Sequence, residues 1–460
     1  MAESTCIEDL PEGIIIHILS FLPTIYAIRA SLISRKWRNL WYHIHILNFD
    51  MNLFRTPLNR HSATRDFFAD FITQTLILRP NFTPIHTFRL HFDYRHTIRR
   101  RLDADSWIRH AIHSGAAVLR LDFDVTTRAA YDYKNDVTHS DNDFPDEAYE
   151  SYGFHFYELK NCDSVKVLKL TCCDIVWPKS NGGNRRILTD CFSSLCSVSL
   201  DQVYLTDDDL FALVSSLVNL EYLSLSGLSP LVNFKIHSQK LKELKLGMFM
   251  VHYKGPAVGS LEISCPSLDK IRFDSFLVEE YYLKDLSSLV EASVDFFFRS
   301  REVFVCWWEL MQVLRDSCVE RLITPNMRFD RDCWLELLDA EDFSKCCAFE
   351  NLKHLELKTS YAEDDIIGIA AFLEVCSTVE SLVIDYCCDC EDNDSLSEGF
   401  MNGELITHIP NLKQVKMKNY KGTENELYLV KLLKLFNVVL REIVGVPPTV
   451  NGTVLPSIVL

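Results

Sequence analysis

A short pattern of apolar and polar residues recurs along most of the chain. In each copy an apolar residue is followed by others three and five positions later, as in LEYLSL from Leu220, LKELKL from Leu241 and LKHLEL from Leu352. Because the last four residues alternate, each copy predicts a short strand with one buried face. The copies begin at residues 85, 116, 165, 195, 220, 241, 268, 289, 319 (a weak copy, VERLIT), 352, 379 and 412.

The segments between these strands predict helices or irregular connections. DADSWIRHAIHSG (103–115) and TDDDLFALVSSL (206–217) space their apolar residues by three and four, and Asp is expected to act as the N-cap. One strand and one such segment, repeated at short intervals, is typical of a leucine-rich-repeat solenoid of the α/β class. No single repeat can bury its apolar residues alone. The alternative is a doubly wound α/β domain, which the short and variable connections disfavour.

The strand pattern also predicts which side chains point inward. Leu223, Leu244 and Leu355 occupy equivalent inward positions, and their strand neighbours should face outward on a broad binding surface. Neither charge dominates this outward row, so we expect it to bind a protein segment. The row comprises Lys166 or Lys169, Ser199, Ser224, Lys245, Arg272, Glu356 and Lys416.

Three segments interrupt or end the array. Residues 126–153 are polar, acidic and without period, and they predict a surface insertion. RDFFADFITQTLIL (65–78) has helical spacing of its aromatic and aliphatic residues and is expected to pack on the first repeat. The stretch 425–445 predicts a closing helix. Its apolar face would consist of Leu429, Leu432, Leu433, Phe436, Val439 and Leu440.

The apolar stretch LPEGIIIHILSFLPTIYAIRASLISRKWRNLW (10–41) does not follow the repeat pattern. Its spacing predicts a first helix that begins after Leu10-Pro11 and ends before Pro23, followed by a second and a third short helix. Three helices this short cannot bury both of their faces. We therefore expect an exposed apolar patch that needs a helical partner.

This stretch resembles the F-box, whose pattern is filled at Leu10-Pro11, Ile18 to Pro23, Ser31, Ser34, Trp37 and Leu40-Trp41. The remainder is similar to plant-type F-box/LRR-repeat proteins, with an FBD-like C-terminal element in KMKNYKGTENELYLVKLLKLFNVVLREI. The resemblance implies a substrate receptor of an SCF-type ubiquitin ligase. In that assembly the F-box docks on a Skp-type adaptor, which joins a cullin and a RING protein, while the repeats bind the protein to be ubiquitinated.

The resemblance also implies domain limits and contact residues. The expected domains are an F-box (1–47), a linking helical segment (48–80), leucine-rich repeats (81–418, with the insertion 126–153) and an FBD-like cap and tail (419–460). No catalytic residue is expected. The residues expected to bind the adaptor are Leu10, Pro11, Ile15, Ile18, Leu19, Leu22, Ile28, Ser34, Trp37 and Leu40.

Charge and composition restrict the partners and the compartment. The net charge of −17 is uneven: residues 1–110 hold 14 Lys/Arg and 10 Asp/Glu, or +4, so the rest carries −21. A body this acidic disfavours nucleic acid as its ligand. No apolar run approaches the roughly 20 residues that span a bilayer. The sixteen cysteines show no disulfide spacing, and the acidic N-terminus is unlike a signal peptide. We expect a cytoplasmic or nuclear protein with no membrane contact.

Other functional classes find less support in the residues. No hydrolase, phosphate-loop or zinc-protease motif is present, so an enzyme is disfavoured and no cofactor is expected. CCDCEDND (387–394) and the pair His43 and His45 lack the spacing of a metal site. Two alternatives stay open: a repeat scaffold without a ligase, and a receptor that needs a small molecule. Four basic residues within 29–38 suit an acidic adaptor surface.

Overall fold

The computed structural model divides into two compact units, Met1–Pro230 (the N-terminal unit) and Leu231–Leu460 (the C-terminal unit), and each is described by itself. The described residues are 10–54, 61–80, 83–94, 98–123, 151–159, 162–177, 192–228, 231–247, 257–274, 278–295, 301–324, 349–359, 362–374, 376–386, 410–436, 441–448 and 457–459. The CCDCEDND motif and nearly all of the expected insertion lie outside them. No helix in these ranges is both long and apolar enough to cross a membrane.

The chain begins with two short helices that start at prolines. Helix α1 spans Glu12–Ser20 and α2 spans Thr24–Ala30, with Pro11 and Pro23 at their N-caps. Proline suits this place because the first N–H groups of a helix have no partner within it. The predicted third helix is shorter than expected: turns follow α2, and then comes a single turn of 3-10 helix, η2 (Leu40–His43).

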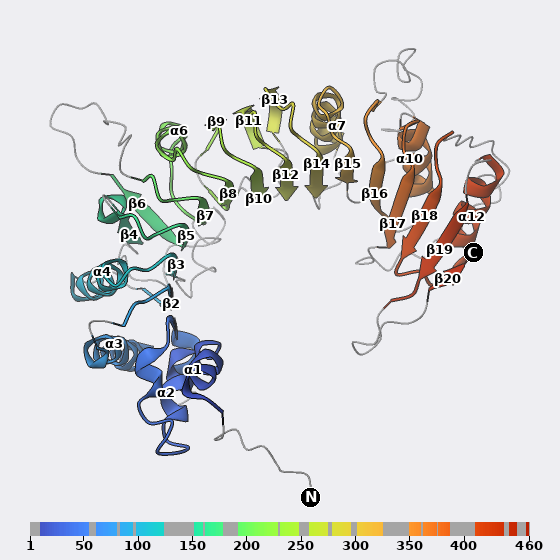
Figure 1. Ribbon diagram of the computed structural model, residues 1–460. Helices are drawn as coiled ribbons and strands as arrows, with labels where there is room; N and C mark the ends of the chain where they lie inside the picture. The colour runs from blue at the N-terminus through green and yellow to red at the C-terminus, as the bar shows by residue number, and fades with distance from the viewer. Residues whose placement is uncertain are drawn as a thin grey trace, which may run out of the picture. The chain divides into compact units, whose positions relative to one another are not determined.

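The N-terminal unit is built on parallel strands paired in chain order, β1 with β2, β3, β5, β7 and β8 in turn (Figure 1). Every predicted strand of this unit is present, and each begins two residues after the start of its pattern. Strand β1 was not predicted, although IHILNF from Ile44 carries the same pattern. The bounds are β1 Ile46–Asp50, β2 Thr87–His91, β3 Val118–Asp122, β5 Val167–Thr171, β7 Ser197–Asp201 and β8 Tyr222–Ser226.

One face of this sheet is covered by α3 (His61–Leu78), α4 (Ile98–His113) and α6 (Asp207–Ser216), with the small parallel pair β4 (Tyr152–His155) and β6 (Cys173–Val176) on the same side (Figure 1). The 3-10 turns η3 (Met51–Phe54) and η4 (Phe156–Leu159) directly follow β1 and β4, and η3 packs on α3.

The outer helices follow the predicted spacing with three differences. In α3, Phe68 and Ile72 are buried as expected, whereas Phe67 is 69% exposed. Helix α4 begins at Ile98, five residues before the predicted start. The N-cap of α6 is Thr206 and not an aspartate: its hydroxyl accepts from Asp209 N, and the Asp209 carboxylate accepts from Thr206 N. This reciprocal capping box satisfies two N–H groups that would otherwise lack partners.

The C-terminal unit continues the same design. Its parallel strands pair in chain order from β10 to β19, and β20 (Ile458–Val459) pairs with β19 antiparallel. The bounds are β10 Glu243–Gly247, β12 Lys270–Asp274, β14 Glu291–Asp295, β15 Arg321–Thr324, β16 His354–Thr359, β17 Ser381–Tyr386, β18 Gln414–Lys418 and β19 Glu442–Val446.

The predicted closing helix over 425–445 is wrong in its second half. Helix α12 spans Glu424–Phe436, and residues Glu442–Val446 form β19, which pairs with β18 in register. The stretch LREIVG from Leu440 has the strand pattern, and the apolar spacing of the preceding helix concealed it. The sheet therefore extends past residue 418.

The outer layer of this unit contains helices and a second sheet (Figure 1). The helices are α7 (Arg301–Arg315), α10 (Glu363–Glu374) and α12. The second sheet, which the sequence analysis did not predict, consists of β9 (Asn233–His237), β11 (Ala257–Ser264) and β13 (Val278–Lys284), all parallel, with β11 central. Strands β9 and β11 bury alternating residues on one face, whereas β13 buries Val278 and Tyr281, three positions apart.

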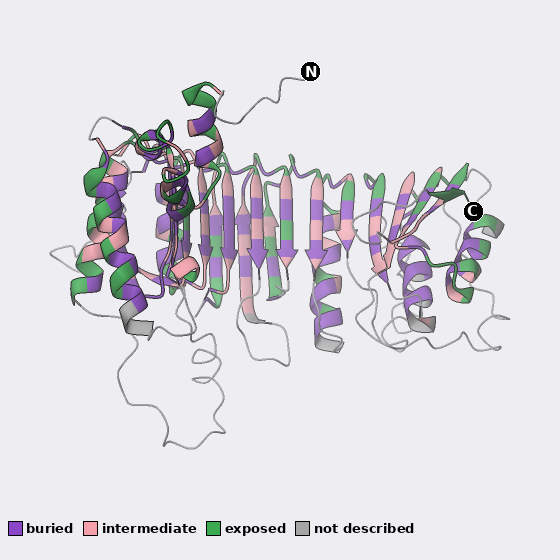
Figure 2. Ribbon diagram, turned by 90° about the horizontal axis from the view of Figure 1, so that it is seen from below, coloured by how far each residue is buried: buried purple, intermediate pink, exposed green. Residues whose placement is uncertain are grey.

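Alternating burial along the strands confirms the inward register (Figure 2). Leu223 and Leu244 are fully buried and Leu355 is 1% exposed. Of the predicted outward residues, Lys245 and Glu356 lie on the opposite face and are half-buried, but Ser224 is buried at 8% exposure. Its side chain is too short to reach past its neighbours on that face.

A cluster of opposite charges on the second sheet makes stability depend on pH. Glu262 lies between Lys235 (Oε2 to Nζ, 2.8 Å) and Lys284 (Oε1 to Nζ, 3.2 Å). Hydrogen bonds from Lys235, then from Lys284, lower the pKa of Glu262 from 4.5 to about 2. A carboxylate whose pKa is lower in the folded state stabilises the protein above its unfolded pKa, and this contribution is lost as the pH falls toward the folded pKa.

We therefore expect Glu262→Gln to lower the free energy of unfolding at pH 6, and the difference from the native chain to disappear between about pH 4.5 and about pH 2. Denaturant unfolding over this range is the measurement. Glu279→Gln, at an exposed position on β13, is the charge-matched control. A pH-independent difference between Glu262→Gln and the native chain would contradict the prediction.

Candidate functional site

The N-terminal helices form a small apolar core of their own. Ile15 and Leu19 of α1 are fully buried, and Trp37 and Leu40 are 5% and 6% exposed. Helix α1 packs on η2, and α2 packs on β1. The Thr24 hydroxyl, at the start of α2, accepts a hydrogen bond from Asn48 N of β1 at 2.8 Å. This segment is thereby attached to the first strand of the sheet.

The same segment exposes an unusual number of large apolar side chains. Leu32 is 85% exposed, Phe21 71% and Ile33 68%. Ile14, Leu22 and Tyr26 are also exposed, which makes six within residues 14–33. We call these six residues the apolar patch. So many exposed large apolar side chains within one short segment are typical of a protein–protein interaction site.

Local backbone structure holds the most exposed members of the apolar patch in place. Phe21 lies at the C-cap of α1, where its ring contacts His17 edge-on at 4.8 Å. After α2 the chain continues in turns: Leu32 N donates to Arg29 O and Ile33 N donates to Ala30 O, both at 3.0 Å. These bonds hold the backbone of Leu32 and Ile33 beyond the end of α2, where their side chains do not pack in the core.

The ten residues predicted to bind the adaptor lie in different environments. Ile15, Leu19, Trp37 and Leu40 are buried in the core of the segment and do not reach its surface. Leu10, Ile18, Ile28 and Ser34 are half-buried, whereas Pro11 and Leu22 are exposed. The physical reason is that α1 has a buried face and an exposed face, and the motif contains residues of both. Their contribution to adaptor binding stays a prediction.

Of the six patch residues only Leu22 was among the ten predicted, and Ile14, Phe21, Tyr26, Leu32 and Ile33 were missed. In the sequence, Phe21 lies three residues after Ile18 and Leu32 four residues after Ile28, so both follow helical spacing. Helix α1 ends at Ser20 and α2 ends at Ala30, and both residues therefore lie beyond the helices whose spacing they follow.

Basic side chains accompany the apolar patch. Arg29, Arg35, Lys36 and Arg38 are all exposed. Lys36 Nζ donates to Leu10 O at 2.8 Å, and the Arg29 guanidinium lies 5.7 Å from the centre of the Tyr26 ring. The surface around the apolar patch is thus positive, which suits an acidic partner.

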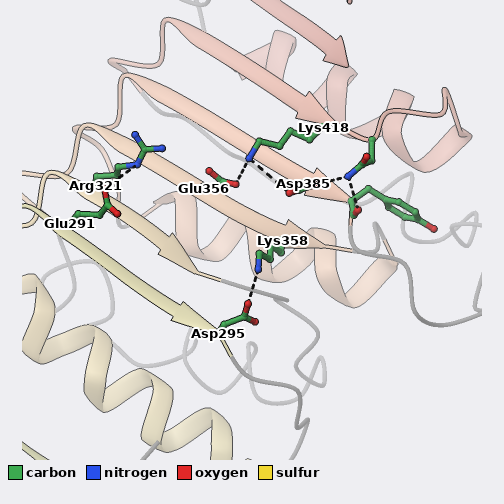
Figure 3. Close-up of polar contacts among 9 residues, drawn as sticks. Glu291, Asp295, Arg321, Glu356, Lys358, Asp385 and Lys418 are labelled. Atoms are coloured by element: carbon green, nitrogen blue, oxygen red, sulfur yellow. Dashed lines mark hydrogen bonds and ion pairs between the residues drawn. The ribbon is translucent and has the colours of Figure 1, made fainter. Parts of the chain in front are cut away.

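A second candidate surface is the inner face of the sheet, defined as the face opposite the helices. In the C-terminal unit it carries ion pairs between strands that are adjacent or two apart in the sheet (Figure 3). Lys358 Nζ lies 2.7 Å from Asp295, Arg321 Nε lies 3.9 Å from Glu291, and Lys418 contacts both Glu356 and Asp385. Lys245 and Arg272 have acidic neighbours as well. The predicted mixture of charges is found in this unit.

The described residues give little support to metal or nucleophilic chemistry. They contain no group of three or more His, Cys, Asp or Glu side chains arranged for a metal ion. His45 Nδ1 lies 3.2 Å from Pro84 O and is held by the backbone. Burial raises the pKa of Cys265 to about 11, and it also raises the pKa values of Cys173 and Cys376. These thiols stay protonated at neutral pH and are therefore poor nucleophiles.

Comparison with known proteins identifies both parts of the chain. The F-box domain family matches residues 7–48, and the At1g61320/AtMIF1 LRR domain family matches residues 81–432, more than half of the chain. The chain is 24% identical to the Arabidopsis thaliana F-box/LRR-repeat protein At3g58930, over 92% of this chain and 86% of that protein.

Two further similar proteins from Arabidopsis thaliana carry both the F-box and the LRR repeat in their names. F-box/LRR-repeat protein At5g38396 is 24% identical over 92% of this chain and 87% of its own length. F-box/FBD/LRR-repeat protein At2g04230 is 28% identical over 60% of this chain and 49% of its own length. With an N-terminal F-box followed by a parallel-strand repeat array, the chain belongs to the F-box/LRR-repeat family.

Proposed function

We propose that the protein is the substrate-recognition subunit of an SCF-type ubiquitin ligase. The observation that carries the proposal is the apolar patch, which lies within the F-box match at residues 7–48. F-box/LRR proteins are typical substrate receptors of such ligases. The F-box docks on a Skp-type adaptor and through it on a cullin and a RING protein, while the repeat array binds the protein to be ubiquitinated.

In this proposal the predicted residues act in two ways. Residues that reach the surface, such as Pro11 and Leu22, contact the adaptor directly together with the apolar patch. Buried residues, such as Ile15 and Trp37, hold the helices in the geometry that presents the patch. Large apolar side chains at the centre of an interface contribute most of its binding energy, so Phe21, Leu32 and Ile33 are the best candidates for anchors.

The basic residues near the patch support the same partner. Opposite charges across an interface mainly raise the association rate and exclude wrong partners. Arg35 and Arg38 are exposed in the same segment as the patch and suit acidic side chains of an adaptor, whereas Lys36 donates to Leu10 O. The transfer chemistry belongs to other subunits of the ligase, so the receptor needs no catalytic group of its own.

The direct test is binding of the purified chain to a purified Skp-type adaptor. We expect Phe21→Ala, Leu32→Ala and Ile33→Ala each to raise the Kd by about tenfold or more, measured by calorimetry, because each truncation removes apolar area from the interface. The thermal unfolding of the chain should change little, since all three side chains are exposed.

Phe67→Ala and Ile77→Ala are matched controls. Both side chains are exposed on α3, at 69% and 73%, and both lie outside the F-box. They should leave the Kd for the adaptor unchanged. Failure of the native chain to bind the adaptor would overturn the proposal and favour the alternative of a repeat scaffold without a ligase link. Unaltered binding by the triple variant F21A/L32A/I33A would show that these three side chains are not the adaptor contact.

A further inference from the structure

The inner face of the N-terminal unit carries three basic residues side by side. Strand pairing places Arg89 of β2 opposite Arg120 of β3, and Arg120 opposite Lys169 of β5. All three point away from the core, because their strand neighbours Leu90, Leu119 and Leu168 are buried. Adjacent parallel strands lie about 4.8 Å apart, so the Cα atoms of Arg89 and Lys169, on either side of Arg120, are about 10 Å apart. We call Arg89, Arg120 and Lys169 the basic row.

The basic row is not neutralised by the rest of the protein. Among the residues that the structure describes, no carboxylate lies in an ion pair with any of the three side chains, whereas the cations of the C-terminal unit's inner face mostly have one. Like charges placed opposite each other across strands destabilise a sheet. Burial lowers the pKa of Arg89, and repulsion from the charge of Arg120 lowers it further.

The surroundings of the row offer further hydrogen-bond donors. Arg89 Nε is buried and has no hydrogen-bond partner among the described residues. On the next strand the row continues with Ser199, whose hydroxyl group can donate to an oxygen. Guanidinium groups bind planar and tetrahedral oxyanions through paired N–H donors, so two neighbouring arginines favour a carboxylate or a phosphate.

Acidic residues flank the basic row on one side only. The next row toward the carboxyl ends of the strands includes Asp50, Asp122 and Asp201, and Asp122 is already in contact with His91 at 3.2 Å. A ligand on the row therefore needs its negative charge concentrated over the arginines and not spread along the strands.

We propose that Arg89, Arg120 and Lys169 form an oxyanion site that binds a negatively charged segment, carrying clustered carboxylates or a phosphate, of the protein recruited by the repeats. The proposal rests on the proposed receptor function and adds the chemical class of its substrate. It also changes the expectation from the sequence, because the predicted balance of charges along the outward row does not hold in this unit.

A protein segment fits this site better than a nucleic acid does. Nucleic-acid binding needs many phosphate contacts along an extended positive surface. The basic row covers three strands, and the inner face of the C-terminal unit is neutralised by its own ion pairs. The net charge of −17 would repel a polyanion elsewhere on the molecule.

The test uses the full-length chain and short fluorescent peptides of one neutral backbone that carry clustered glutamates, a phosphoserine pair or glutamines in their place. At low ionic strength, fluorescence anisotropy should show binding of the glutamate or the phosphoserine peptide at least about tenfold tighter than of the glutamine peptide. The triple variant R89Q/R120Q/K169Q should lose this preference. If the glutamate peptide binds tighter, the site prefers carboxylates. If the phosphoserine peptide binds tighter, the site prefers a phosphate.

The matched control is K245Q/R272Q/K418Q, which removes the same number of charges from paired cations on the inner face of the C-terminal unit. It should keep the preference for the acidic peptides within about twofold. Equal losses in both triple variants would show unspecific electrostatics and would overturn the site. Unchanged binding by the basic-row variant, or tighter binding of a short RNA than of either acidic peptide, would also overturn it.

Two further measurements separate the site from a folding defect and from the receptor function. Arg120→Gln should leave the Tm unchanged or raise it, because it relieves repulsion with Arg89; a lowered Tm would show a structural role instead. Adaptor binding should be intact in R89Q/R120Q/K169Q. If the native chain fails to bind the adaptor but binds the acidic peptides, the receptor function fails while the oxyanion site stands.

Discussion

Replacing Leu355 with alanine is expected to lower the free energy of unfolding by about 2–5 kcal/mol, because it leaves a cavity in a closely packed interior. Leu355 is 1% exposed on β16. Strand pairing places it between Leu322 of β15 and Leu382 of β17, both fully buried. Regular strands on both sides hold these neighbours, so they cannot collapse into the space.

Chemical unfolding monitored by circular dichroism measures the effect. Lys416→Ala is the control, since this side chain is exposed on the inner face of β18 and should change the stability by less than about 0.5 kcal/mol. An array of repeats can unfold in parts, so hydrogen exchange of β15, β16 and β17 should accompany the measurement. Similar stability of Leu355→Ala and the native chain would contradict the packing of these strands.

The strands could be predicted from sequence because their pattern has a physical cause. Every copy of the pattern from residue 85 to residue 412 corresponds to an observed strand, and each of these strands buries one face. The weak copy at Val319 is included, as β15. Stacked repeats require this periodicity, because the buried side chains of each strand must pack on the equivalent side chains of the preceding strand.

The same pattern could not reveal which sheet a strand joins. LVNFKI from Leu231 and VEEYYL from Val278 have the pattern, yet they form β9 and β13 of the second sheet. A period of two requires only that one face is buried, and the second sheet satisfies that condition on the outer layer. The sheet that a strand joins depends on its pairing with strands distant in sequence, and the local sequence does not indicate this pairing.

Prediction of the candidate sites had a similar limit. The motif located the F-box, but it did not separate residues that support its surface from residues that form it. Ile15 and Leu22 both follow helical spacing, and only the packing of α1 on η2 buries the first and exposes the second. The basic row was hidden for another reason: Arg89, Arg120 and Lys169 are far apart in sequence and become neighbours through strand register.

A further large effect is expected at Gly259 in β11. Its φ of +134° lies in a region that residues with side chains rarely adopt. A Cβ atom at this position would lie 1.9 Å from the carbonyl oxygen of Val232 and 2.8 Å from its carbonyl carbon. Both are backbone atoms that cannot rotate away. The pairing of β11 with β13 also shifts register between Ala257 and Ser260, so the glycine forms part of a bulge.

Gly259→Ala should therefore destabilise the second sheet by more than about 2 kcal/mol, through backbone strain and loss of the hydrogen bond from Ser260 N to Val232 O. We expect a lower Tm and faster hydrogen exchange in β9 and β11. Gly13→Ala is the matched control: no atom lies within 4 Å of its added Cβ, and alanine favours α1 by about 0.5–1 kcal/mol. The two identical substitutions should thus shift the Tm in opposite directions, and a stable Gly259→Ala chain with unchanged exchange in β9 would show that the strands do not approach at this glycine.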